Sequence, residues 1–243
     1  ATVASVDGGL YRLPVGPLEP GAAIGEHESI RTGPGAHAVL RLADGSTVDV
    51  NEGTELYLAA AWSGQAIHLQ RGDIIVKAAK QRRGDLRVLT RDSIASVKGT
   101  VFAVSAGLGG SVVSVVEGSV AVNQPGREVL LSPGEQAASV PALASSVAAA
   151  IAWSPEAESY LELLASFGKI ERELAADLPG DLRMNSALLS YLPAGAVVYG
   201  TVPNPGVTIG RALFLADEQA SQNATFGAWW NSETGRLLRE MTD

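Results

Sequence analysis

Histidine, cysteine and serine are the side chains most often used for acid–base, metal and nucleophilic chemistry, so their spacing is the first guide to an active site. The chain has three histidines, His27, His37 and His68, and none of them stands in an HxH or HExxH metal-binding spacing. It has no cysteine, which excludes disulfides, thiolate metal sites and cysteine nucleophiles. It also has no G-x-S-x-G nucleophile elbow and no phosphate-binding glycine loop. The sequence therefore predicts no catalytic residue, no metal site and no cofactor, and we expect a protein that is not an enzyme.

Four carboxylates gather in a short stretch that could offer oxygen ligands to a hard cation such as Ca²⁺. They are Asp44, Asp49, Glu52 and Glu55. The stretch lacks the Asp/Asn loop with a terminal glutamate, and its alternation predicts side chains that face solvent. A carboxylate pair for glycoside hydrolysis can form from residues far apart in sequence, so an enzyme acting on a polysaccharide stays open as an alternative.

Positive charge is concentrated in one part of an otherwise acidic chain. Seven of the 18 lysines and arginines lie between positions 77 and 98, whereas the whole chain has a formal net charge of -8. Such a patch can steer an acidic protein surface or anionic lipid headgroups to the chain. The alternative is an edge strand and a loop that charge keeps soluble and unpaired. As candidates for a protein interface we single out five of these bases: Lys77, Lys80, Arg82, Arg83 and Arg87.

The densest aromatic cluster is Trp229-Trp230, which follows Phe226. Adjacent residues point in different directions along a helix, so one indole can anchor the core while the other meets a partner. Tryptophan is also enriched at interface hot spots. Trp229 and Trp230 are therefore predicted either to pack inside their domain or to take part in a protein interface.

Up to position 141 the sequence predicts short strands, and these would position the candidate residues of that half. Valine-rich alternating segments are separated by glycine-containing turns, which is the pattern of an all-β domain. Asp44-Gly45 predicts a hairpin between segments 38–42 and 47–50, and Arg71-Gly72-Asp73 predicts another between 67–69 and 74–76. We expect about ten strands in a sandwich or roll. The remaining predicted strands are 86–89, 94–97, 101–104, 112–116, 120–122 and 129–131.

After Pro141 the apolar residues recur at helical spacing, and the chain is predicted to be mostly helical. We place helices at about 154–176, 186–191, 209–218 and 232–241, and a short extended piece at 197–199. The change of pattern divides the chain into an all-β domain, residues 1–141, and a helical (α/β) extension, residues 142–243. No apolar run reaches the length of a membrane helix, so we expect membrane contact only through segments absent from this chain.

The composition limits the class of protein and its partners. The chain has 243 residues, of which 46% are hydrophobic and 18% charged, and this predicts folded domains rather than disorder. The excess of 26 acidic over 18 basic side chains argues against nucleic acid as a partner, because phosphate binding needs clustered positive charge.

Five short motifs follow one another in the all-β half. They are Thr32-Gly33 before the hairpin 38–46; Leu69-Gln70-Arg71-Gly72; segment 86–90 before 96–104, which contains Val97-Lys98-Gly99-Thr100; segment 113–120, which contains Glu117-Gly118; and Leu131-Ser132-Pro133-Gly134-Glu135. In this order they resemble the pattern of FecR-type domains, and the resemblance covers about residues 20–140.

The resemblance implies a FecR-like β-sandwich or β-roll in the bacterial envelope, in the periplasm or at the cell surface, without catalytic residues. Family members often cross the inner membrane and relay a signal from an outer-membrane transporter to an alternative sigma factor. The cytoplasmic anti-sigma segment and membrane helix of those regulators have no counterpart in the printed sequence, so we expect the β scaffold alone to carry over.

Two functions follow from these expectations. The first is an extracytoplasmic protein-binding or signal-relay module whose partner is another envelope protein or a copy of itself. The alternative is a structural subunit of an envelope or extracellular assembly, completed by strand or helix packing between chains.

Overall fold

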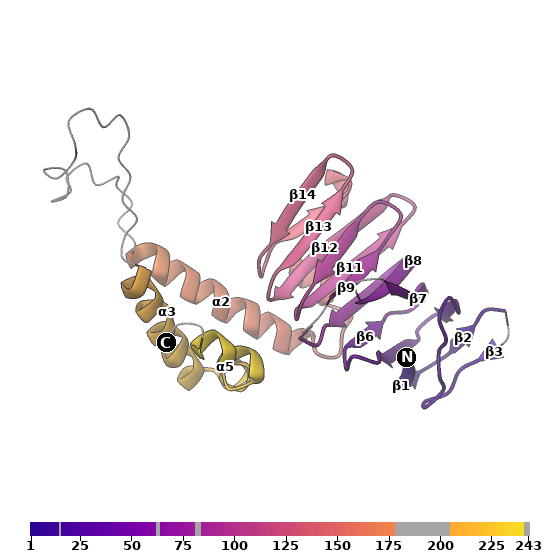
Figure 1. The fold of residues 1–243 in the computed structure, drawn as a ribbon, viewed down its shortest axis with the longest axis horizontal. Coiled ribbons are helices and arrows are strands. Elements are labelled where there is room, and N and C mark those ends of the chain that lie inside the picture. Colours follow the sequence, from indigo (N-terminus) through magenta and orange to yellow (C-terminus); the bar gives the residue numbers. More distant parts are fainter. Residues whose placement is uncertain (15, 62–63, 81–83, 178–204, 241–243) are drawn as a thin grey trace, which may run out of the picture. The chain divides into compact units, whose positions relative to one another are not determined.

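The computed structural model describes residues 1–14, 16–61, 64–80, 84–177 and 205–240 (Figure 1). Contacts among the residues group the chain into two compact units, Ala1–Leu164 and Ala165–Asp243. The first unit contains all fifteen strands found in the described residues, whereas the described part of the second is helical. The predicted fold class, mainly β followed by a mostly helical C-terminal region, is confirmed. The predicted domain boundary at residue 141 stays a prediction.

The strands form two sheets that share one long strand, β8 (Gly64–Lys77). The described strand pairs are antiparallel, with the exception of β8 and β9, which are parallel. Sheet A has the order β1 (Thr2–Asp7), β5 (His37–Arg41), β6 (Thr47–Val50), the second half of β8, β11 (Val101–Gly107), β12 (Gly110–Glu117) and β15 (Gln136–Ala138). Sheet B has the order β14 (Arg127–Leu131), β13 (Val120–Gln124), β10 (Ile94–Val97), β9 (Asp85–Leu89), the first half of β8, β7 (Glu55–Ala61), β4 (Ile30–Thr32), β2 (Leu10–Arg12) and β3 (Gly16–Pro17).

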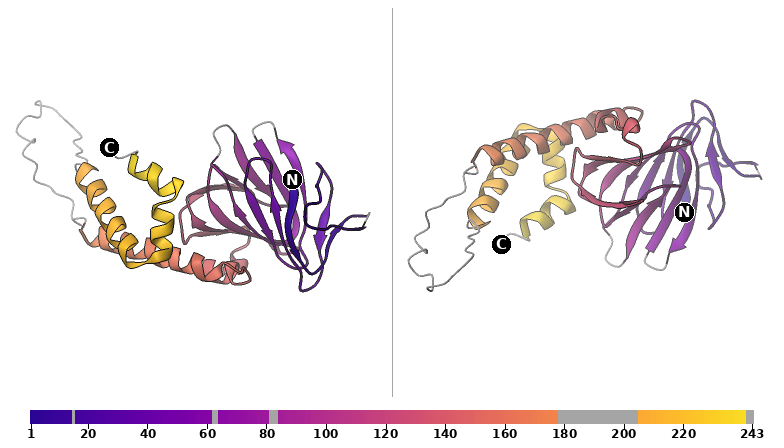
Figure 2. Two further views of the ribbon diagram at one scale, coloured as in Figure 1. Left: turned by 90° about the horizontal axis from the view of Figure 1, so that it is seen from below. Right: turned by 90° about the horizontal axis from the view of Figure 1, so that it is seen from above.

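The main hydrophobic core lies between the two sheets, whose strands are seen in two further views in Figure 2. Alternate residues of each strand point into it, as the period of two requires. Leu40, Val76 and Phe102 enter it from sheet A, and Ile67 and Val88 enter it from sheet B. The same alternation turns the intervening residues to the outer face of each sheet.

The predicted hairpin at Asp44-Gly45 is confirmed, because β5 pairs with β6 and Gly45 has a φ of 90°. The predicted hairpin at Arg71-Gly72-Asp73 is wrong. β8 continues through these residues and passes from sheet B, where Arg71 pairs with Glu55, to sheet A, where Gly72 pairs with Ala106. Gly72 has a φ of 95°, and a Cβ at this position would collide with Thr54. Glycine is therefore required for a change of sheet and not for a reversal of the chain.

The other strands predicted after position 85 correspond to β9 through β14. The structure adds the strands β1 to β4, the strand β7 and the strand β15, which the sequence analysis did not place. The strands β2, β3, β4 and β15 have only two or three residues, and β7 ends in three alanines. β1 has six residues, but its valines stand at positions 3 and 6 and do not alternate.

A helical segment follows the strands and packs on the outer face of sheet A. It consists of the 3-10 turn η1 (Pro141–Leu143), α1 (Val147–Ile151) and the start of α2 (Ala157–Asp177), whose residues up to Leu164 belong to the first unit. α1 contacts β11 and β12, and η1 contacts β12 and β15. A second hydrophobic cluster results, with Ile75, Ala103 and Val116 from the sheet and Val147, Ile151 and Tyr160 from the helices. The helix predicted from Ser154 begins at Ala157, because Ser154 sits in the preceding turn and its Oγ accepts a hydrogen bond from Glu156 N.

The helical unit contains α3 (Pro205–Gln222), α4 (Ala224–Trp230) and α5 (Glu233–Glu240), together with the later part of α2. α3 and α5 correspond to predicted helices, whereas α4 was not predicted; its N-terminus is capped by Asn223, which accepts from Phe226 N. The predicted helix 186–191 and the extended piece 197–199 lie outside the described residues. Among the described helices, none combines the length and the apolar character needed to span a membrane.

Candidate protein-binding surfaces

Lys77, the first base of the predicted interface, is occupied within its own unit. It ends β8, and its Nζ forms an ion pair with Glu156 Oε2 at 2.5 Å. The same ammonium lies over the ring of Tyr160, 5.7 Å from its centroid. Lys77 therefore holds the start of α2 on sheet A. That Lys77 contacts another protein stays a prediction. Such a contact would have to replace the ion pair with Glu156.

The remaining basic candidates are divided between a loop and a strand. Lys80 follows β8 and is exposed, and Arg87 lies on β9 and is half-buried. Arg82 and Arg83 lie outside the described residues. The alternative prediction of an edge strand is wrong for β9, because it pairs with β8 on one side and β10 on the other. The run of bases is therefore not one continuous edge, and Arg87 belongs to the middle of sheet B.

Trp229 and Trp230 lie in the aromatic core of the helical unit. Trp229 meets Phe167 edge to face at 4.8 Å, and both tryptophans contact Phe226. Trp230 is 5% exposed, and its Nε1 donates to Asp217 Oδ1 at 2.7 Å. A role in packing accounts for these contacts, and a role at an interface stays a prediction.

The four carboxylates of the acidic stretch do not converge. Asp44 accepts from Ser46, Glu52 accepts from Gly35 N, and Glu55 pairs with Arg71. Within the described ranges, no group of three histidine or carboxylate side chains is placed to hold a metal ion. The prediction that all four face solvent is wrong for Asp49, which is 6% exposed. Burial raises the pKa of Asp49, although the nearby charges of Lys77 and His37 oppose the increase.

The histidines separate between the two sheets. His37 lies on β5 of sheet A, 5.9 Å from the ring of Trp153. His68 lies on β8 in sheet B and stacks on Tyr57 of β7 with ring centroids 4.4 Å apart, while the ring of His27, in a turn, lies 6.0 Å from that of Tyr57. Burial and the neighbouring His27 lower the pKa of His68. In the described residues these two imidazoles contact a phenol ring, and they belong to an aromatic cluster.

The outer face of sheet B is built by pairing across six strands. One row runs through Tyr57, His68, Leu89, Ile94, Asn123 and Glu128, from β7 to β14. The next row runs through Ala59, Ala66, Arg87, Ser96, Ala121 and Leu130. We call these twelve residues the sheet B face. It mixes apolar side chains with a few charged and amide groups, which is the composition of many protein interfaces.

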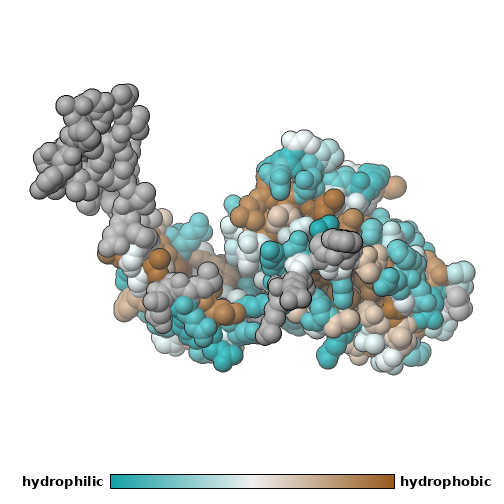
Figure 3. Space-filling view, in the orientation of Figure 1, coloured by the Kyte–Doolittle hydropathy of each residue, from teal (hydrophilic) through white to brown (hydrophobic). Residues whose placement is uncertain are grey.

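Large apolar side chains of the sheet B face are exposed. Leu130 on the terminal strand β14 is 69% exposed, and Ile94 on β10 is 40% exposed. Figure 3 shows hydrophobic surface in the region of β13 and β14, bordered by hydrophilic residues. The sequence analysis did not select this face, although Arg87, Ser96 and Ala121 each stand between two buried residues of a predicted strand.

A polar network joins the two sheets at one end of the sandwich. Asp92, in the turn between β9 and β10, accepts hydrogen bonds from Ser111 Oγ at 2.6 Å and from Ser139 Oγ at 2.7 Å. Thr90 also donates to this carboxylate, and Ser111 Oγ, whose proton is directed to Asp92, accepts from Ser93 Oγ at 2.7 Å. Burial alone would raise the pKa of Asp92, but the hydroxyl donors together lower it. With serine and aspartate but no histidine base, the network supplies a structural cross-link and not a catalytic triad.

Comparison with known families confirms the predicted resemblance. Residues 28–121 match the family model described as FecR protein. These residues include β4 to β12 and the first two residues of β13, so they supply most of both sheets and the strand β8 that the sheets share. No curated protein matches the chain.

Two solved structures resemble part of the chain. Both are crystal structures, at 2.50 Å and 1.65 Å resolution, of a protein from Parabacteroides distasonis described as a candidate anti-sigma factor. Each is 25% identical and covers 46% of this chain, with TM-scores of 0.42 and 0.41. The matched region spans 55% and 56% of those chains, which is about half of their length.

Proposed function

We propose, taking residues 28–121 as a FecR domain, that this chain is a non-enzymatic, extracytoplasmic protein-binding or signal-relay module of the bacterial envelope. FecR proteins are a regulatory family, and a regulatory role requires a surface that a partner recognises. The observation that carries the proposal is the sheet B face, where Leu130 and Ile94 expose apolar surface beside Arg87. Burial of such side chains at a protein interface contributes favourable free energy of roughly 25 cal/mol per Å².

The partner is expected to be another envelope protein. An acidic surface would complement Arg87, and apolar side chains would cover Ile94 and Leu130. In this proposal the β unit supplies the recognition surface and performs no reaction itself.

The test is site-specific photocrosslinking in the cell envelope of the bacterium that encodes the chain. A photoreactive amino acid replaces Ile94 or Leu130 on the sheet B face. The matched control replaces Leu108, which is 95% exposed at the turn between β11 and β12, away from this face. We expect one protein to be crosslinked from positions 94 and 130 but not from 108, and mass spectrometry identifies it.

The identified partner is then purified and its association with the chain is measured. Ile94→Asp should weaken this association at least ten-fold, because a charge would be buried without a partner. Equal crosslinking from all three positions, or unchanged affinity of the Ile94→Asp variant, would contradict the proposal.

A structural subunit of a larger assembly is the second candidate, and the terminal strand β14 favours it. Among the described strands β14 pairs only with β13, so its other edge presents backbone groups that a strand of a second chain could pair with. Light scattering of the full chain at increasing concentration separates the two functions. A mass that rises with concentration, and that Leu130→Lys returns to a monomer, supports the assembly; a constant monomer mass excludes it.

A further inference from the structure

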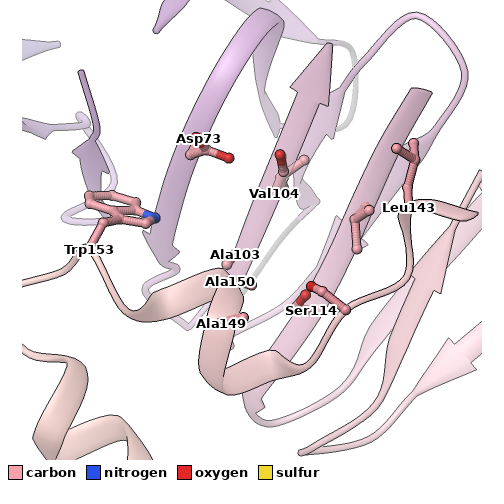
Figure 4. A pocket seen from close by; sticks show the side chains of 11 residues that line it. Asp73, Ala103, Val104, Ser114, Leu143, Ala149, Ala150 and Trp153 are labelled. Carbon is pink, nitrogen blue, oxygen red and sulfur yellow. The ribbon is translucent and has the colours of Figure 1, made fainter. Parts of the chain in front are cut away.

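A cavity of about 240 Å³ lies between α1 and the outer face of sheet A, within the first unit (Figure 4). Its floor comes from β8, β11 and β12, and its wall comes from α1 and the residues on either side of it. Pockets for drug-sized molecules measure roughly 300–1,000 Å³, so this cavity fits a smaller molecule of the size of one sugar ring. The lining residues that matter for recognition are Asp73, Ala103, Ser105, Ser114, Ala150 and Trp153.

Two polar groups of this lining have no partner in the described part of the chain. The Nε1 of Trp153 is buried and donates no hydrogen bond. Asp73 uses its backbone N and O to bond Thr54 Oγ1, but no hydrogen bond or ion pair involves its carboxylate. In Figure 4 the nitrogen edge of Trp153 and the carboxylate of Asp73 face the same space. Because buried polar groups in folded proteins nearly always have partners, a bound molecule that accepts from the Trp153 N–H is the simplest explanation, and the half-buried carboxylate of Asp73 is open to the same molecule.

The chemistry of the lining selects the class of this molecule. An anion would be repelled by Asp73, and a cation would pair with Asp73 but leave the Trp153 N–H without an acceptor. A hydroxyl group can accept from the indole, and a second hydroxyl can donate to the carboxylate. The hydroxyl of Ser105 can do both, and that of Ser114, which already accepts from Gln136 Nε2, can donate. Ala103 and Ala150 offer apolar surface to carbon-bound hydrogens. We propose that this cavity binds a neutral polyhydroxy ligand, namely a single sugar ring or the terminal sugar of a glycan.

The wall of the cavity is held in place by contacts outside it. Val147 and Ile151 anchor α1 on Ile75 and Ala103 in the second hydrophobic cluster. The ion pair between Lys77 and Glu156 fixes the chain just after Trp153. The cavity is therefore a preformed feature of the first unit, and it lies on a different sheet from the proposed protein-binding surface. A sugar site here is independent of the protein partner proposed above.

The test uses the full chain with glucose, galactose and N-acetylglucosamine as probes, by saturation-transfer NMR and calorimetric titration. Ala149→Leu places a larger side chain in the cavity, whereas Ala148→Leu makes the same change at an exposed neighbour that does not line it. We expect at least one sugar to bind, Ala149→Leu to weaken it at least ten-fold and Ala148→Leu to leave it unchanged.

Trp153→Phe retains an aromatic ring but removes the N–H, and should weaken binding about five-fold, the equivalent of one hydrogen bond. This variant also keeps the test valid if Ala149→Leu unfolds, which circular dichroism detects. Failure of all three sugars to bind overturns the proposal. Binding that responds equally to Ala149→Leu and Ala148→Leu, or that Trp153→Phe leaves unchanged, overturns it as well.

Discussion

The outer faces of the two sheets differ in their side chains and in what covers them. On sheet A the outward residues Ile75, Ala103 and Val116 are apolar and are buried beneath α1 and the start of α2. On sheet B the outward residues include Arg87, Asn123 and the exposed Leu130. Both sheets turn apolar residues inward, so the outward residues decide which face receives a helix. The comparison separates a face used for stability from a face available to a partner.

The largest expected effect is loss of the helical cover from sheet A. Ile151→Ala removes a fully buried side chain from the second hydrophobic cluster and should lower the free energy of unfolding by about 2–4 kcal/mol. Urea denaturation followed by circular dichroism measures it. The matched change on sheet B is Ile94→Ala, which should cost less than about 1 kcal/mol because Ile94 is already partly exposed. Equal losses in the two variants would show that the two faces do not differ in this way.

A smaller effect is expected at the polar network that joins the sheets. Asp92→Ala removes the acceptor of Ser111 and Ser139 and should lower the free energy of unfolding by about 1–2 kcal/mol, since the site is partly open to solvent. Asp92→Asn retains an acceptor and should cost less. If Asp92→Ala leaves the urea midpoint unchanged, the network does not contribute to holding the sheets together.

The pH dependence of the same carboxylate has a definite sign. The pKa of Asp92 is lower in the folded state than its ordinary value of 3.8. Its stabilising contribution is therefore complete above that value and is lost as the pH falls through the folded-state pKa. Below about pH 3.8 the urea midpoint of the unmodified chain should fall more steeply than that of Asp92→Asn. If the urea midpoints of the two proteins fall equally with pH, Asp92 is not the group responsible for the loss of stability.

Asp49, beneath the helical cover of sheet A, should behave in the opposite way. Burial raises its pKa above 3.8, so ionisation of Asp49 in the folded state costs free energy once the pH exceeds that value. Asp49→Asn should raise the free energy of unfolding at pH 7 by up to about 1 kcal/mol, and the gain should disappear as the pH approaches 4. Asp7→Asn, at an exposed position of the same sheet, is the control and should change little. A loss of stability in Asp49→Asn at pH 7 would mean that attraction to Lys77 outweighs the cost of burial.

The smallest effect on stability is expected on the sheet B face. Arg87→Glu should change the free energy of unfolding by no more than about 0.5 kcal/mol. The same change should slow association with an acidic partner and reduce its dependence on salt, which stopped-flow measurements with the purified partner can show. A large loss of stability would instead place Arg87 among the residues that hold the sheet together.

Much of the strand order could be predicted because turn glycines separate alternating segments, as at Asp44-Gly45. The bend at Gly72 could not be distinguished from a hairpin, since both place a glycine of positive φ between two apolar segments. The distinction depends on Thr54, whose Oγ1 accepts from Asp73 N, and this contact joins residues distant in sequence.

The candidate surfaces were predicted less well, for a related reason. Lys77 looks like a free base in the sequence, but its partner Glu156 lies 79 positions away. Asp49 alternates as a solvent-facing residue would, and only the later helical segment buries it. The sheet B face could have been found by marking Arg87, Ile94 and Leu130 as the outward positions of predicted strands, because that step needs only the period of two.

The sharing of β8 between the layers has a consequence for how the β unit comes apart. Its first half pairs with β7 and β9, and its second half pairs with β6 and β11, without a break in the chain. Loss of β8 would disrupt sheet A and sheet B together. No cut of the polypeptide can therefore release either sheet intact. Truncation cannot yield a half-sandwich, and melting of the two layers should be a single cooperative event.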